Sequence, residues 1–302
     1  MKILVTGATG LVGTNLVNEL DKKHEVFKMS RKLSMDLRDK DLAKVIIGTF
    51  KPEVVYHLAA NAAEARGQIS PQDMTEENLN IFLNTLVPFI NAKGKRFIYT
   101  SSISVYGDVP APYSDDYHPE PKDVYGINKL ACEQILKVMA KVYNFEYVIV
   151  RPHNIYGPHQ NMNDPYRNVI ALFMRRLLEG QSYKLFGEGK MIRQFSYVDD
   201  VVSVLEQAID KFTNQTFNLG SDLISTIKEI SDELIGITGI EPAIEYAPAR
   251  PQEILEFVAS HTRQNSLTIY HETPLLIGLS QTWQWAKQQK LGELIQREDE
   301  IK

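Results

Sequence analysis

The sequence predicts an α/β fold, in which a doubly wound parallel sheet is joined to a smaller C-terminal α/β lobe. In the first half of the chain, short apolar runs alternate with segments whose apolar residues recur at helical spacing, which is the pattern of βαβ units. The length of 302 residues suits one or two domains with a large buried core. Hydrophobic residues make up 43% and charged residues 24%, as in folded globular proteins.

The first half supplies the parallel sheet. Strands are predicted at the short apolar runs, over residues 2–6, 24–29, 53–57, 96–100 and 146–150. Helices are predicted between them, over residues 11–20, 39–50, 74–92 and 124–143. A parallel sheet built from such units is covered by helices on both faces.

The regular alternation of predicted strands and helices ends after Arg151, and we assign the rest of the chain to the smaller lobe. Its predicted helices cover 169–178, 201–211 and 226–237, and its β-like runs cover 183–186, 193–197 and 216–219. No Gly/Ser linker or charge block separates the two halves. We therefore expect a first domain over 1–165 and a second over 166–302, interleaved so that some segments of the second return to the first.

Composition narrows the possible partners. The 33 basic and 38 acidic residues give a net charge of −5, whereas a dedicated nucleic-acid binder needs a basic face. Cys132 is the only cysteine, so an internal disulfide and a multi-cysteine metal site are excluded, and we expect no metal site. No segment approaches the roughly 20 apolar residues of a membrane span. We expect a cytoplasmic protein that binds neither nucleic acid nor membrane.

A glycine-rich loop joins the first strand to the first helix. Its sequence is Thr-Gly-Ala-Thr-Gly-Leu-Val-Gly over residues 6–13. Glycines here permit a tight turn, and the start of the helix presents free N–H groups to a pyrophosphate. The loop predicts a dinucleotide site on a Rossmann-type sheet, although an ordinary glycine turn is the alternative. The expected contacts come from Gly7, Thr9, Gly10, Leu11, Val12 and Gly13.

Further motifs follow in a fixed order. Tyr125 and Lys129 form a Tyr-x-x-x-Lys pair one helical turn apart. The runs Thr-Ser-Ser-Ile-Ser-Val-Tyr-Gly at 100–107 and Arg-Pro-His-Asn-Ile-Tyr-Gly-Pro at 151–158 each begin where a predicted strand ends. With the Gly-x-x-Gly-x-x-Gly loop, these motifs resemble the extended short-chain dehydrogenase/reductase family. Within it, they resemble the NAD(P)-dependent group of nucleotide-sugar epimerases, dehydratases and reductases.

The resemblance implies a catalytic triad of Ser102, Tyr125 and Lys129. A tyrosine with an ordinary pKa near 10 is a poor base at neutral pH. A lysine ammonium nearby favours the phenolate, which can then remove a proton from a sugar hydroxyl. In the family, Lys129 also holds the nicotinamide ribose, and Ser102 binds the reacting oxygen.

Several activities within and outside this family are compatible with the motifs. Family dehydratases carry an Asp-Glu pair directly after the Ser/Thr position, where this chain has Ile103 and Ser104, so elimination of water is not expected. The leading hypothesis is a nucleotide-sugar epimerase that acts by transient oxidation at C4 of the sugar. The alternatives are an NADP-dependent nucleotide-sugar reductase or 3,5-epimerase/reductase and, from another class, a non-catalytic cofactor-sensing protein.

The end of the second predicted strand bears on the choice of cofactor. NAD-preferring members usually have an acidic residue there, but this chain has Ser-Arg-Lys at 30–32 and no carboxylate before Asp36. Arg31 could bind a 2′-phosphate, so NADP is favoured and NAD stays open. A solvated loop is the alternative role for Arg31. The resemblance adds to the expected cofactor contacts Asp36, Leu37, Ala59, Ala60 and Asn78.

The expected substrate is a nucleotide-diphosphate sugar. By resemblance, Asn154 and Asn168 reach its diphosphate and neighbouring groups, while Ser104 lines the sugar pocket. Arg193 and Arg250 match the family's two phosphate-clamping arginines, because a guanidinium offers paired donors to a diphosphate. The alternative for each arginine is a surface salt bridge.

Two long predicted helices suggest a homodimer, as is common in the family. Each carries more apolar residues than one face against a sheet requires. The alternative is a deeply buried helix in a monomer. The residues concerned are Ile81, Phe82, Leu83, Leu86, Val87, Phe89 and Ile90 in the first helix and Ile135, Leu136, Val138, Met139, Val142 and Tyr143 in the second.

Overall fold

The computed structural model describes residues 1–164, 168–249 and 255–292. Its main sheet has six strands in the order β10-β5-β4-β3-β1-β2, and every neighbouring pair is parallel. The bounds are β1 Lys2–Thr6, β2 Glu25–Met29, β3 Val54–His57, β4 Arg96–Thr100, β5 Glu146–Pro152 and β10 Gln215–Leu219. This sheet confirms the predicted doubly wound α/β class.

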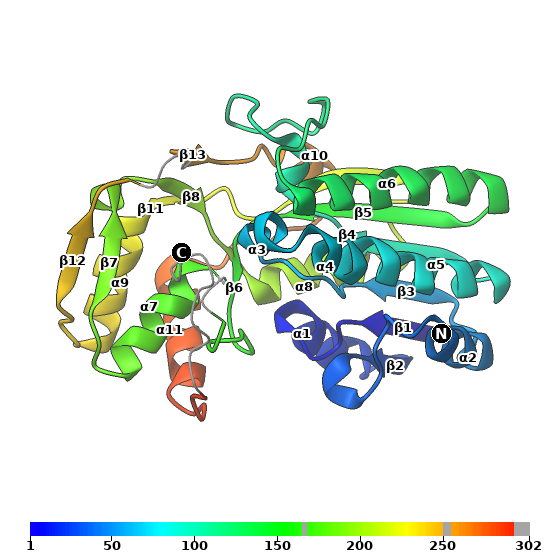
Figure 1. The fold of residues 1–302 in the computed structure, drawn as a ribbon, viewed down its shortest axis with the longest axis horizontal. Helices are drawn as coiled ribbons and strands as arrows, with labels where there is room; N and C mark the ends of the chain where they lie inside the picture. Colours follow the sequence, from blue (N-terminus) through cyan, green and yellow to red (C-terminus); the bar gives the residue numbers. More distant parts are fainter. Residues whose placement is uncertain (165–167, 250–254, 293–302) are drawn as a thin grey trace.

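Alternate residues of each strand enter two separate cores. In β1, Ile3 and Val5 belong to one hydrophobic cluster and Leu4 belongs to the other. The first cluster is covered by α1 Leu11–Leu20 and α8 Val198–Gln207. The second is covered by α2 Lys40–Phe50, α5 Ile81–Asn91 and α6 Val124–Tyr143 (Figure 1). Burial on both faces explains why the strands read as continuous apolar runs.

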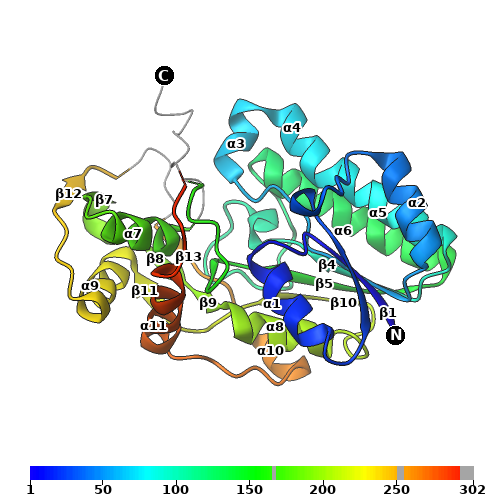
Figure 2. The same cartoon turned by 90° about the horizontal axis from the view of Figure 1, so that it is seen from below.

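The smaller lobe lies beside the main sheet in both views (Figures 1 and 2). A three-stranded sheet runs β11-β8-β13, and two-stranded sheets pair β12 with β7 and β6 with β9. The strands are β6 Ile155–Tyr156, β7 Tyr183–Phe186, β8 Ile192–Gln194, β9 Ser196–Tyr197, β11 Ile224–Thr226, β12 Ile244–Ala247 and β13 Glu256–Phe257. The other helices of the second half of the chain are α7 Val169–Leu178, α9 Ile227–Thr238, α10 Thr262–Leu267 and α11 Leu275–Ala286. A short 3-10 turn, η4, covers Gly187–Gly189.

Several elements differ from the sequence prediction. The run at 216–219, which we assigned to the smaller lobe, lies in β10 at the edge of the main sheet, where it pairs with β5. The single strand expected over 193–197 is divided into β8 and β9. The helix α3 Glu64–Ile69 was not predicted, and neither were the short 3-10 turns η1 Arg31–Leu33 and η3 Ile103–Tyr106.

The single helix predicted over 74–92 is also wrong. That segment contains the end of α4 Pro71–Thr75, a π-type turn η2 at Glu76–Asn80, and α5. The side-chain amide of Asn78 donates to the Met74 carbonyl at 2.8 Å, four residues earlier. A side chain that bonds this carbonyl competes with the backbone N–H groups of a regular helix.

None of the helices in the described ranges is long and apolar enough to cross a membrane.

Candidate active site

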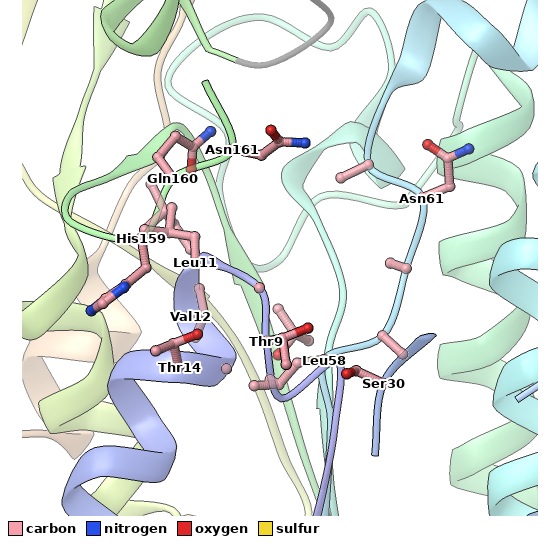
Figure 3. A pocket seen from close by; sticks show the side chains of 18 of the residues that line it. Thr9, Leu11, Val12, Thr14, Ser30, Leu58, Asn61, His159, Gln160 and Asn161 are labelled. Atoms are coloured by element: carbon pink, nitrogen blue, oxygen red, sulfur yellow. The ribbon is translucent and has the colours of Figure 1, made fainter. Parts of the chain in front are cut away.

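A cleft of about 980 Å³ lies where the strands of the main sheet end and the smaller lobe begins. The chain passes from β1 to β2 on one side and returns to β3 on the other, so the order reverses beside β1. Ligands of open α/β sheets bind at such a reversal. Figure 3 shows Thr9 in the glycine loop and Leu11 and Val12 at the start of α1, with Gln160 on one side of the cleft and Asn61 on the other.

The glycine loop has no room for larger side chains. Gly7 has a φ of +67°, and a Cβ there would lie 2.8 Å from the Ala59 backbone nitrogen. A Cβ on Gly13 would lie 2.2 Å from the Gly7 carbonyl oxygen. Gly10 caps α1 without a side-chain hydrogen bond, so the first turn of α1 keeps free N–H groups at the cleft. This is the arrangement that binds a pyrophosphate.

Charged side chains gather at the end of β2. Arg31 forms an ion pair with Glu77 at 2.6 Å, and Arg38 pairs with Asp36 at 2.7 Å. The hydrogen bond from Arg38 is the main reason why the pKa of Asp36 is lowered. All four side chains line the cleft. The positive charge of Arg31 is therefore partly compensated before any cofactor binds.

The predicted triad comes together at the other end of the cleft. Ser102 follows β4 and caps η3 by accepting the Ser104 backbone N–H at 3.1 Å. Tyr125 lies in the first turn of α6, which Asp123 caps through the Gly126 backbone N–H at 2.8 Å. Ser102, Tyr125 and Lys129 all line the cleft. The backbone of Tyr125 therefore lies at the N-terminal end of a helix, where the helix dipole favours negative charge.

Lys129 is buried beneath Tyr125. Its Nζ lies 5.6 Å from the centre of the Tyr125 ring and donates to the Thr100 carbonyl at 2.7 Å. Burial lowers the pKa of Lys129 to about 8. The ammonium is still the main form at pH 7, so it can stabilise the Tyr125 phenolate as the sequence analysis predicts.

Glu64, which the sequence analysis did not single out, also lines the cleft. Its carboxylate accepts a hydrogen bond from the Ser104 hydroxyl, and Ser104 Oγ lies 3.0 Å from Ser102 Oγ. Glu64 begins α3, whose alanine-rich surroundings carry no apolar periodicity. Only the family position of Ser104 pointed to this place, and nothing in the local sequence pointed to Glu64.

The cleft brings together most of the residues expected there, but Arg193 does not line it, and neither does Asn78. This side chain is buried and donates to the Asn61 and Met74 carbonyls at 3.2 and 2.8 Å. It therefore supports the loop that carries Asn61 and does not line the cleft. The expected residues that line it are Gly7, Thr9, Gly10, Leu11, Val12, Gly13, Arg31, Asp36, Leu37, Ala59, Ala60, Ser102, Ser104, Tyr125, Lys129, Asn154 and Asn168.

The expected substrate contacts are placed unequally. Asn154 lines the cleft, while its amide donates to the Gln194 carbonyl at 2.9 Å. Asn168 caps α7 and donates to the Ile155 carbonyl at 2.6 Å. Arg193 does not line the cleft itself. Its guanidinium lies 5.9 Å from the centre of the Phe257 ring, and Phe257 lines the cleft. Arg250 lies outside the described residues.

A chain of three polar side chains supports the wall beside Asn154. His153 Nε2 lies 2.9 Å from His261 Nε2, and His261 Nδ1 lies 2.8 Å from the Asp222 carboxylate. Burial lowers the pKa of His153 to about 3, so its ring is neutral at pH 7. His153 therefore supports the wall through its contact with His261.

A buried ion pair fixes β5 to α6. The Glu133 carboxylate accepts from Arg151 Nε at 2.9 Å and Nη2 at 2.6 Å, and from the Ser101 hydroxyl at 2.6 Å. Arg151 also donates to the Tyr106 hydroxyl at 2.7 Å. Both charged side chains are almost completely buried. This network joins the segment before Ser102 to the helix that carries Tyr125 and Lys129.

The glycine loop, the buried lysine and the tyrosine at a helix N-terminus define a nicotinamide-dinucleotide-dependent enzyme on a Rossmann-type sheet. A model of the NAD dependent epimerase/dehydratase family matches residues 3–220. The chain belongs to this family, which confirms the resemblance and the enzyme class drawn from its motifs.

Several proteins that are similar to this chain over most of its length are named as UDP-sugar 4-epimerases. UDP-glucose 4-epimerase of Mycolicibacterium smegmatis is 30% identical, with 87% of this chain and 91% of that protein covered. The structure of Thermotoga maritima UDP-glucose 4-epimerase with UDP-glucose is 28% identical, with a TM-score of 0.89 over 94% of this chain and 98% of that one. Bacillus cereus UDP-glucuronic acid 4-epimerase, in complex with UDP-glucuronic acid and NAD, is 26% identical, with a TM-score of 0.85 over 95% and 99%.

Proposed function

We propose that the protein is a nucleotide-sugar 4-epimerase that binds a UDP-sugar. The observation that carries this proposal is the convergence of Ser102, Tyr125 and Lys129 in the cleft that the glycine loop opens. The names of the similar epimerases support a UDP-sugar as the substrate. The fold alone would not decide the activity.

Side chains of the protein itself would carry out the proton transfer in this reaction. The glycine loop would hold the cofactor's pyrophosphate, and a bound nicotinamide supplies the hydride acceptor and donor. Tyr125, as phenolate, removes the proton from the sugar C4 hydroxyl while the C4 hydride leaves. Ser102 binds the same oxygen, and Lys129 keeps Tyr125 ionised. Once the 4-keto sugar has turned, Tyr125 would return the proton to the C4 oxygen, with a bound nicotinamide supplying the hydride for the opposite face.

Turnover measurement tests this proposal. Purified protein supplied with NAD or NADP should convert UDP-glucose into its C4 epimer without net consumption of cofactor, followed by NMR of the sugar. A reductase would instead consume reduced cofactor in proportion to the product. A cofactor-sensing protein would bind the dinucleotide with no change in any UDP-sugar.

We also propose NADP ahead of NAD, because Arg31, Lys32 and Arg38 line the cleft at the end of β2. Arg31→Ala should weaken NADP binding by about 10- to 100-fold, since a charge-assisted bond to the 2′-phosphate is worth about 1.5–3 kcal/mol. NAD binding should change less than about threefold. Calorimetric titration of both dinucleotides measures this.

Lys28→Ala is the control for Arg31→Ala, because it removes a positive charge from β2 outside the cleft lining. Glu77→Gln should tighten NADP binding by freeing Arg31 from its ion pair. If the unaltered protein binds NAD tenfold more tightly than NADP, the preference proposed here is wrong.

We propose that the protein is cytoplasmic. We also propose that it forms a homodimer through α5 and α6. Val87 on α5 and Val138, Val142 and Tyr143 on α6 are exposed although they are large and apolar. Figure 1 shows the two helices side by side. A second copy covering this face would remove these side chains from water.

Val138→Glu should convert the dimer into a monomer, because a charge would be buried at the centre of the interface. Sedimentation velocity at micromolar concentration measures the change. Val45→Glu is the matched control, since Val45 on α2 is 64% exposed against 61% for Val138. A 34.4 kDa species alone in the unaltered protein would contradict the dimer.

A further inference from the structure

Glu64 places a carboxylate at the sugar end of the cleft. Its partner Ser104 is also bonded to Ser102 in two ways, by the 3.0 Å contact between hydroxyls and by the Ser104 backbone N–H at 3.1 Å. Glu64 is thus two hydrogen bonds away from the serine that binds the reacting oxygen in the proposed function. Both Glu64 and Ser102 line the same cleft.

The surroundings of Glu64 disfavour further negative charge. Its side chain is exposed to the cleft, and its carboxylate accepts a hydrogen bond from the Ser104 hydroxyl. Desolvation by the protein around it raises the pKa of Glu64, against the lowering effect of the Ser104 hydrogen bond; Asp123 raises the pKa further and Arg193 lowers it. A second carboxylate at this place would repel Glu64 or compete with it for a proton.

In the proposed function the C4 oxygen of the sugar binds at Ser102, so the groups on the carbons next to C4 would lie near Glu64. C6 is carried by C5, which is bonded to the reacting C4. The sugar must present both faces of C4 in turn, and turning the ring exchanges the sides on which C3 and C5 lie. With C4 held at Ser102, the C6 group would lie on the Glu64 side in one of the two orientations, and both orientations are needed for turnover.

We propose that Glu64 selects nucleotide sugars whose hexose is uncharged and excludes those with a carboxylate at C6. This inference rests on the proposed function, and family membership does not decide it, because named relatives include epimerases of both UDP-glucose and UDP-glucuronic acid. A hydroxyl at C6 can donate to the Glu64 carboxylate. A uronate instead meets a like charge, which should reduce its kcat/KM by about 10- to 100-fold after partial screening.

The test compares UDP-glucose with UDP-glucuronate. In the unaltered protein, kcat/KM for UDP-glucose should exceed that for UDP-glucuronate by about 10- to 100-fold. Glu64→Gln keeps the size of the side chain and removes its charge, so this ratio should fall at least tenfold. The Kd values of both sugars are also measured by calorimetry in the cofactor-loaded Tyr125→Phe protein, with and without Glu64→Gln. The ratio of the Kd for UDP-glucuronate to the Kd for UDP-glucose should fall in the Glu64→Gln protein.

Glu25→Gln is the matched control, because it removes the same charge at an exposed position of β2 outside the cleft lining. Its ratio should stay within about threefold of the unaltered protein. Equal use of both sugars by the unaltered protein, or a ratio that Glu64→Gln leaves in place, overturns the inference while the proposed function stands. Failure of both sugars to bind or react is the distinct outcome in which the proposed function fails and this inference with it.

Discussion

Replacing Tyr125 with phenylalanine is expected to lower kcat by about 10²- to 10⁴-fold, the usual contribution of a positioned general base. The change removes only the hydroxyl, while the ring keeps its place in the first turn of α6 above Lys129. Folding and cofactor affinity should stay close to those of the unaltered protein. Steady-state turnover, cofactor titration and thermal unfolding measure the three quantities.

Tyr143→Phe is the control, because Tyr143 ends the same helix and is exposed. It should leave kcat unchanged. A Tyr125→Phe protein with activity within threefold of the unaltered one would remove Tyr125 from the mechanism. A large rise in KM at constant kcat would place its role in substrate binding instead of proton transfer.

Glu133→Gln should lower the free energy of unfolding by about 3–5 kcal/mol, because it leaves the Arg151 guanidinium buried without its counter-charge. Glu133 accepts three hydrogen bonds and is fully buried, so water cannot take its place. Urea unfolding followed by circular dichroism measures the loss.

Glu146→Gln provides the comparison for this ion pair. It breaks a pair with Arg96 of the same chemistry, but the Glu146 side chain is 47% exposed. Water can solvate part of the site, and the cost should be nearer 1 kcal/mol. Equal losses for the two variants would show that burial is not what makes the Glu133 pair important.

The sequence was most informative where function depends on local geometry. The glycine loop depends on close backbone approach at Gly7 and Gly13, and only glycine satisfies it. Tyr125 and Lys129 are one turn apart on a helix whose ends the sequence predicts correctly. Such features need only a few neighbouring residues to be recognised.

Contacts between distant segments were less predictable. Glu64 meets Ser104 across 40 residues, in a short helix without amphipathic pattern. Asn78 was expected at the cofactor, but its position depends on the π-type turn that its own side chain helps to form. The strand β10 carries the alternating apolar residues of many strands, and nothing in that pattern names β5 as its neighbour.

The late position of β10 in the chain affects how the protein is made. Until residues 215–219 leave the ribosome, β5 has an unpaired edge. Until residues 198–207 have been made, α8 is not available to cover the first core. Tyr56 on β3 also lacks the Leu205 carbonyl to which its buried hydroxyl donates at 2.8 Å. An open edge invites pairing with other chains, and contacts of long sequence separation form slowly. A nascent chain or a fragment ending at residue 165 would therefore carry the glycine loop, Tyr125 and Lys129 in a sheet prone to aggregation.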